Sequence, residues 1–160
     1  MGFNLATYTA VHVVISLVAI ASGLVVAFGF LTARQSDAWT ALFLRTSIAT
    51  SVTGFGFPFE RLLPSHIVGA ISLVLLAVAI YARYQAALAG VWRRTYIVCA
   101  VIALYLNVFV LVVQSFQKVS ALKELAPTQA EPPFVIAQGV VLVLFVALGT
   151  FATRGRALEQ

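Results

Sequence analysis

The fold is decided by an apolar stretch near the start of the sequence, YTAVHVVISLVAIASGLVVAFGFLTA, which runs from Tyr8 to Ala33. This stretch contains no Asp, Glu, Lys or Arg. About 20 apolar residues in helical conformation cross the ~30 Å hydrocarbon core of a bilayer. The stretch therefore predicts a membrane-spanning helix.

The composition of the whole chain agrees with this prediction. Of its 160 residues, 62% are hydrophobic and only 9% are charged. Soluble domains carry roughly 45–50% apolar and about 25% charged residues, and charged residues normally cover the surface of a soluble protein. The composition excludes an ordinary water-soluble domain and indicates an integral membrane protein.

Dividing the chain into segments of membrane-spanning length predicts one all-α transmembrane domain over residues 1–160, a bundle of about five helices. The spans are expected at about 8–33, 38–57, 66–84, 95–116 and 134–153. The second span is the weakest because it contains Arg45 and many hydroxyl groups, so a re-entrant segment is the alternative. The start of the chain has no basic region and no cleavage site, so we expect the first helix to be retained.

The formal charge of +5 is dispersed over helix ends, a pattern that is typical of membrane topology and not of nucleic-acid binding. Basic loops favour the cytoplasmic side of a membrane, which predicts an N-out, C-in orientation. We expect the inner half of the bundle to be nearly featureless apart from Arg45. The basic residues on the inner side would be Arg34, Arg83, Arg93, Arg94, Arg154 and Arg156.

The few polar side chains within the spans gather near the outer surface. His12 and His66, the only two histidines, are expected within one or two helical turns of that surface on different helices. Polar groups inside a membrane are costly and by default suggest a functional site. They also serve as hydrogen-bonding links between helices, and His66 is placed to cap its helix. The other members of this predicted polar layer are Glu60, Asn107, Gln114 and Gln138.

Three interpretations of the polar layer stay open: interhelical links, a bound cofactor or metal, and a path for protons or substrate. Among cofactors, b-type haem is the sensible one, because His12 and His66 offer two axial imidazoles from different helices. Gly69, about one turn from His66, would let a macrocycle approach the backbone. A structural zinc ion is less suitable because it needs four N or S ligands and Cys99 is the only cysteine.

Arg45 is the other unusual residue of the spans. A charge at the bilayer centre costs ~2.5–3.5 kcal/mol on the insertion scale, and its long side chain can extend towards the inner headgroups. No carboxylate within the spans is available to pair with it. Contact with an anionic lipid and a role in an ion path are the two functional interpretations.

The stretches TSVTGFGFPF (50–59), LPSHIVG (63–69) and APTQAEPPF (126–134) resemble a group of uncharacterised small bacterial membrane proteins. The resemblance implies a location in the bacterial inner membrane and brings no known activity. The sequence carries no nucleotide-binding loop, nucleophile elbow or zinc-protease motif. The hypotheses are a haem-binding electron-transfer subunit, a non-catalytic subunit that forms a homo-oligomer or joins a larger membrane complex, and a small channel or carrier.

Overall fold

The structure is a computed structural model that describes residues 4–57 and 64–154. These residues are helical throughout apart from their connections, so the all-α class is confirmed. The elements in chain order are α1 (Leu5–Thr32), α2 (Asp37–Gly54), α3 (Pro64–Ile80), the π-helical turn η1 (Tyr81–Gln85), α4 (Val91–Lys118), α5 (Ser120–Leu125) and α6 (Pro132–Arg154). The sequence predicts only a polar connection where the short helix α5 lies.

Helix α1 shows how local chemistry sets the helix ends. The Asn4 side chain accepts hydrogen bonds from the backbone N–H groups of Ala6 (3.0 Å) and Thr7 (3.3 Å), so it caps the first turn. The helix stops where Ala33 adopts a left-handed conformation with φ of 55°. This turn brings the Arg34 carbonyl oxygen so close to Gly29 that a Cβ atom there would clash with it.

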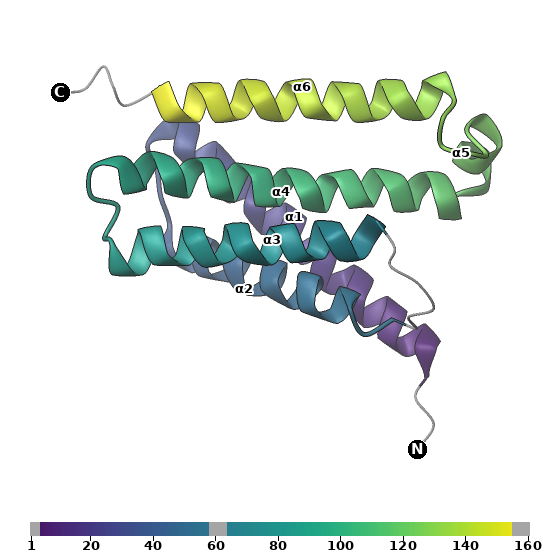
Figure 1. Ribbon diagram of the computed structural model, residues 1–160, viewed down its shortest axis with the longest axis horizontal. Helices are drawn as coiled ribbons and strands as arrows, with labels where there is room; N and C mark the ends of the chain where they lie inside the picture. Colours follow the sequence, from purple (N-terminus) through teal and green to yellow (C-terminus); the bar gives the residue numbers. More distant parts are fainter. Residues whose placement is uncertain (1–3, 58–63, 155–160) are drawn as a thin grey trace.

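The five long helices lie beside one another and alternate in direction, so the described chain begins and ends at opposite ends of the bundle (Figure 1). Helix α4 lies in the middle and contacts α1, α2, α3 and α6. Helix α2 packs along α1 on one side and along α3 on the other. This arrangement gives the bundle two ends at which connections and polar residues collect.

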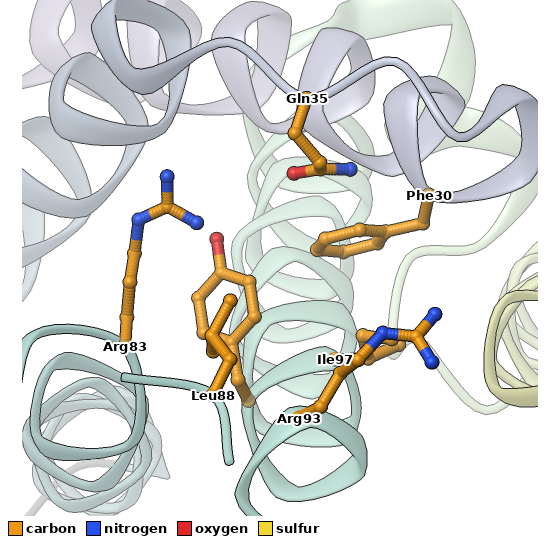
Figure 2. Close-up of a pocket in the computed structure, with 7 residues that line it drawn as sticks. Phe30, Gln35, Arg83, Leu88, Arg93 and Ile97 are labelled. Carbon is orange, nitrogen blue, oxygen red and sulfur yellow. The ribbon is translucent and has the colours of Figure 1, made fainter. Parts of the chain in front are cut away.

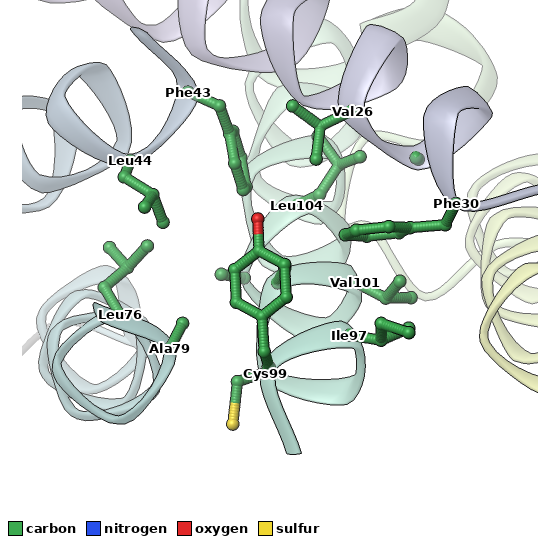
Figure 3. Packing of buried hydrophobic residues seen from close by; sticks show 14 of the residues in the cluster. Val26, Phe30, Phe43, Leu44, Leu76, Ala79, Ile97, Cys99, Val101 and Leu104 are labelled. Carbon is green, nitrogen blue, oxygen red and sulfur yellow. The ribbon is translucent and has the colours of Figure 1, made fainter. Parts of the chain in front are cut away.

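The centre of the bundle is packed around Gly23 of α1. A Cβ atom at this position would lie 2.5 Å from Leu104 Cδ1 and 2.8 Å from Phe43 Cε2. Phe43 and Leu104 are both 1% exposed, and Figure 3 shows them converging from α2 and α4. Because interiors are packed as densely as organic crystals, glycine is the residue that allows these three helices to meet here.

The outer surface of the bundle is apolar. Large exposed side chains include Phe28, Val74, Val143 and Phe151, each more than 60% exposed. Four helical segments are long and apolar enough to cross a membrane: α1, residues 66–85 of α3 and η1, α4 and α6. An apolar exterior around spanning-length helices indicates a membrane protein, because in a bilayer only helices and closed barrels satisfy every backbone polar group.

Candidate functional site

Polar side chains collect at the two ends of α2. The histidine end consists of Tyr8, His12, Thr53, Phe55, Phe57 and His66. The arginine end consists of Phe30, Gln35, Asp37, Thr40, Arg83, Arg93 and Tyr96. The sequence directs attention to the first end, whereas the structure shows that the second also requires explanation.

His12 is held by the last turns of α2. Its Nδ1 atom lies 2.7 Å from the hydroxyl oxygen of Thr53, and its ring contacts that of Phe57 edge to face at 5.1 Å. The Thr53 hydroxyl also donates to the carbonyl of Ala49 at 2.6 Å, and Tyr8 donates to the carbonyl of Thr53 at 2.6 Å. His12 is therefore part of a compact hydrogen-bonded link between α1 and α2.

His66 lies on the other side of α2. It is 5% exposed, and its ring stacks on that of Phe55 at a centroid distance of 5.6 Å. Gly69 makes room for the same ring, because a Cβ atom on Gly69 would lie 3.2 Å from Phe55 Cε2. Each histidine is thus packed against a different aromatic residue at the end of α2.

The remaining residues of the predicted polar layer are spread along the bundle. Asn107 donates to the hydroxyl of Ser47 at 3.1 Å and links α4 to α2. Gln138 donates to the carbonyl of Phe109 at 3.2 Å and links α6 to α4. Gln114 is half-buried in α4, and Glu60 lies outside the described residues. Ser47 precedes Thr53 by six residues, which is about 9 Å along a helix, so the Asn107 contact lies deeper than the His12 contact.

These contacts bear on the haem hypothesis. No group of three or more His, Cys, Asp or Glu side chains that could hold a metal occurs in the described ranges, residues 4–57 and 64–154. A macrocycle near Gly69 would have to displace Phe55 from the space that this glycine provides. Coordination of haem by His12 and His66 stays a prediction, and a visible absorption spectrum of protein expressed with a haem supply would test it directly.

The arginine end carries most of the arginines that the sequence assigns to the inner side, and this end of the bundle is not featureless. The π-helical turn η1 brings Arg83 into the bundle, where its guanidinium pairs with Asp37 and lies 5.4 Å from the ring centroid of Tyr96. The Arg83 side chain is only 10% exposed. Turns of π-helix occur frequently at functional sites, because they redirect side chains that an α-helix would place elsewhere.

A small cavity of about 30 Å³ lies beside Arg83. Figure 2 shows Gln35 and Phe30 reaching towards it from α1 and the connection that follows, with Arg83 opposite. Tyr96, 2% exposed, also lines it, and its hydroxyl lies near the Thr40 hydroxyl and the Arg83 guanidinium. No described residue gives the Tyr96 hydroxyl or the fully buried Thr40 hydroxyl a hydrogen bond of standard geometry. The complete lining is Phe30, Gln35, Arg83, Leu88, Arg93, Tyr96 and Ile97.

Arg45 lies beside a second hollow, a groove of about 180 Å³ between α2 and α3. The groove is lined mainly by aliphatic side chains, with Arg45 and Tyr84 as its polar groups. Arg45 is exposed, and no acidic side chain of the described chain forms an ion pair with it. Its full lining is Ala41, Leu44, Arg45, Ile48, Ile80 and Tyr84.

Sequence reasoning identified Arg45 but missed the cavity around Arg83 and Tyr96. Tyr96 follows Trp92-Arg93-Arg94, a pattern that indicates an interfacial aromatic residue, and Arg83 counts equally well as a loop charge. The polar residues from Arg83 to Gln85, at the end of an aliphatic span, are the one sequence feature that could have indicated this cavity. The π-helical geometry of this segment does not follow from any simple residue spacing.

The comparisons with known proteins add no analogy. The sequence matches no protein family, no curated protein and no solved structure.

Proposed function

We propose that this protein is a non-catalytic module of the bacterial inner membrane, with five spans in an N-out, C-in orientation, that holds an anionic phospholipid at its arginine end. The carrying observation is the groove between α2 and α3, where Arg45 lies at the edge of an aliphatic lining. The resemblance to small bacterial membrane proteins supports the location, and the hydrogen bonds of the polar layer support a structural role for that layer.

The proposal of five spans depends on α2, which is less apolar than the other long helices. Apart from the exposed Arg45, its polarity is directed inwards and its outer face is apolar. The buried residues include Thr40, Ser47 and Ser51, whereas Trp39, Leu42 and Val52 are exposed. Both ends of α2 also contact ends of its neighbours, through Asp37 and Arg83 at one end and through Thr53 and Tyr8 at the other. These features support a helix that crosses the same layer as α1 and α3.

The orientation rests on the charges at the two ends of the bundle. The described arginines at the arginine end are Arg34, Arg83, Arg93, Arg94 and Arg154, with Asp37 as the acid. The described charges at the opposite end are Lys118, Lys123, Glu124 and Glu131, which balance one another. Arg61 and Arg156 lie outside the described residues. The positive-inside rule places the arginine end in the cytoplasm.

Single cysteines introduced into a Cys99→Ala protein test this topology with a membrane-impermeant maleimide. In intact spheroplasts, we expect Lys123→Cys to be labelled and Ser36→Cys and Gln85→Cys to be protected until the membrane is opened. A re-entrant α2 would place Ser36 and Gln85 on opposite sides. Labelling of only one of these two positions would therefore contradict the five spans, and labelling of both would contradict the orientation.

The phospholipid fits the groove by its chemistry. Side chains on a helix point towards its N-terminus, so Arg45, about 12 Å along α2 from Asp37, extends towards the arginine end. A guanidinium binds a phosphate through paired hydrogen bonds, and Ala41, Leu44 and Ile48 offer an apolar wall for an acyl chain. Basic pockets between membrane helices on the cytoplasmic side are typical of anionic-lipid binding.

Native mass spectrometry of the purified protein with phosphatidylglycerol or phosphatidylcholine tests the lipid. We expect preferential retention of phosphatidylglycerol, with Arg45→Gln lowering its affinity about fivefold, since one basic group near a surface contributes about 1 kcal/mol. Arg94→Gln is the matched control, because it removes the same charge from an exposed position outside the groove. Ile48→Trp should fill the groove and expel the lipid while Arg45 remains. Equal retention in Arg45→Gln and Arg94→Gln would refute the site.

Self-association is a second proposal, and it rests on the exposure of α6. None of the most apolar 18-residue window of α6 is buried, although the helix packs against α4 and one part of α1. A lipid-facing helix and a helix that contacts another subunit share this property. A monodisperse monomer in a native-mass measurement would exclude the homo-oligomer. The channel or carrier hypothesis stays a prediction, to be tested by flux into liposomes with wild-type and His66→Ala protein.

A further inference from the structure

We propose that the cavity at the arginine end binds a single small monovalent anion, with chloride as the physiological occupant. The site is separate from the lipid groove, and the proposal is independent of the phospholipid. It arises from the juxtaposition of the Arg83, Tyr96 and Gln35 side chains around one partly open pocket. Each of these groups donates hydrogen bonds.

The Tyr96 hydroxyl is the first observation that points to a ligand. It is deeply buried and lines the cavity, and its polar neighbours, the Thr40 hydroxyl and the Arg83 guanidinium, do not give it a hydrogen bond of standard geometry. A buried polar group without a partner is costly, and a bound water or ion is one explanation of such a group in a native structure. The hydroxyl lies next to Arg83, so a ligand that it contacts would also meet a positive charge.

The electrostatic surroundings distinguish an anion from a water molecule. Two guanidinium groups, Arg83 and Arg93, line the cavity. The carboxylate that pairs with Arg83 belongs to Asp37, whose side chain is 98% exposed and therefore well solvated. Helices α2 and α4 begin at this end, but α1, α3 with η1, and α6 end there, so their opposed helix dipoles offset one another. The positive charge at the pocket therefore comes from its arginines.

The size of the cavity limits the occupant. A volume of about 30 Å³ exceeds the ~10–15 Å³ that one water molecule requires, so the pocket itself suits a single small ion. Phe30 and Ile97 form an apolar part of the wall. A weakly hydrated ion such as chloride or bromide tolerates that mixture of donors and apolar contacts better than a polyatomic anion.

Thermal unfolding of the purified protein in a zwitterionic detergent tests the proposal. Sodium chloride is exchanged for sodium gluconate at constant ionic strength, so that only the identity of the anion changes. We expect the unfolding midpoint to rise saturably with chloride, because a ligand that binds the native state stabilises it. Identical midpoints in chloride and gluconate would mean that the cavity holds only water.

Tyr96→Phe is the decisive variant, since it removes one hydroxyl and keeps the ring. We expect the half-saturating chloride concentration to rise about tenfold or more, because hydrogen bonds to charged groups are the strong ones. In gluconate, the variant should be as stable as wild type or more stable, because the orphaned hydroxyl is gone. Tyr81→Phe, an exposed tyrosine at the same end that does not line the cavity, is the control and should leave the chloride response unchanged.

Bromide gives a direct readout that does not depend on stability. In crystals soaked in bromide, an anomalous peak is expected between Arg83 and Tyr96 in wild-type protein. The absence of an anomalous peak at this position would overturn the proposal, as would a Tyr96→Phe protein whose chloride response equals that of wild type.

Discussion

The two ends of α2 use polar groups in opposite ways. At the histidine end, the polar groups bond to one another, with His12 joined to Thr53 and Tyr8 joined to the Thr53 carbonyl. At the arginine end, charged and hydroxyl groups surround a cavity, and the neighbouring hydroxyls of Thr40 and Tyr96 have no hydrogen bond of standard geometry within the described chain. The comparison teaches that polar groups inside one bundle can either link helices to one another or line an open space, and only the second arrangement leaves donors available to a ligand.

The two ends of α2 are joined by a tightly packed middle region of the bundle. A substitution in this region should lower the free energy of unfolding more than any other substitution proposed below. Gly23→Ala would place a methyl group within 3 Å of Phe43 and Leu104. Overpacking of this kind costs typically 1–3 kcal/mol, so we expect the free energy of unfolding to fall by about 2 kcal/mol. Unfolding in mixed detergent and dodecyl sulfate micelles would measure the change.

Gly139→Ala is the matched control, because a Cβ atom on Gly139 meets nothing within 4 Å. Alanine is a better helix former than glycine by up to about 1 kcal/mol, so this variant should be neutral or slightly stabilised. Equal destabilisation of the two variants would mean that the close approach of α1, α2 and α4 at Gly23 does not exist in the membrane-embedded protein.

The next effect sharpens the contrast between linked and orphaned hydroxyls on α2 itself. Thr53→Val removes the partner of His12, whereas Thr50→Val removes a buried hydroxyl that has no hydrogen bond within the described chain. Interhelical hydrogen bonds in membranes contribute about 0.6 kcal/mol on average and up to about 1.7 kcal/mol. We expect Thr53→Val to lose about 1 kcal/mol of unfolding free energy and Thr50→Val to lose none.

The same unfolding measurement compares both threonine variants in one experiment. Thr50 and Thr53 are close in sequence and chemically identical, so propensity effects cancel. A larger loss for Thr50→Val than for Thr53→Val would show that the histidine end is held by contacts other than the His12 link.

Much of this architecture follows from the sequence because membrane solvation is a strong constraint. The uncharged stretch before Arg34 and the aliphatic run after His66 can only be long helices in a bilayer, and both are. The sequence also indicates that His12 faces another helix, since its face carries small residues. Its partner Thr53 was not predictable, because the hydroxyls of α2 are numerous and their spacing does not specify a neighbour.

The arginine end could not be predicted for a different physical reason. Arg83 enters the bundle because five residues at the end of α3 adopt π-helical geometry, which rotates the side chain relative to a regular helix. Positive φ angles at Ala87, Leu88 and Gly90 then turn the chain into α4. Such a combination depends on how α3 and α4 pack, and neither local propensity nor periodicity reports it.

A smaller effect concerns Asp37, the carboxylate that shares Arg83 with the proposed anion. Asp37→Asn removes an exposed partner, and exposed ion pairs contribute about 0–1 kcal/mol, so stability in gluconate should change little. The half-saturating chloride concentration should fall a few-fold, because the anion no longer competes with the carboxylate. Weaker chloride binding in Asp37→Asn would instead mean that Asp37 holds Arg83 in its binding position.

The smallest expected effect concerns Glu131 in the connection between α5 and α6, which lies at the same end of the bundle as the two histidines. Its carboxylate accepts several hydrogen bonds. The Thr128 hydroxyl donates to Glu131 at 2.8 Å, and backbone N–H groups of Thr128 and Ala130 also donate to it. These bonds, led by that of the Thr128 hydroxyl, hold the pKa of Glu131 below its ordinary value of 4.5. The native state therefore favours the ionised form.

The sign of the pH dependence follows from this lowered pKa. The contribution of Glu131 to stability is fully present above pH 4.5 and is lost as the pH falls through the lower pKa of the folded state. Titration of the Glu131 carboxyl carbon by NMR should show that Thr128→Val raises the pKa towards 4.5. Ser120→Ala, in the preceding helix α5 and outside these hydrogen bonds, should leave it unchanged. If Thr128→Val also left the pKa of Glu131 unchanged, the backbone N–H groups alone would stabilise the carboxylate. Hydrogen bonds between side chains would then matter less at this end of the bundle than the contrast between the two ends of α2 implies.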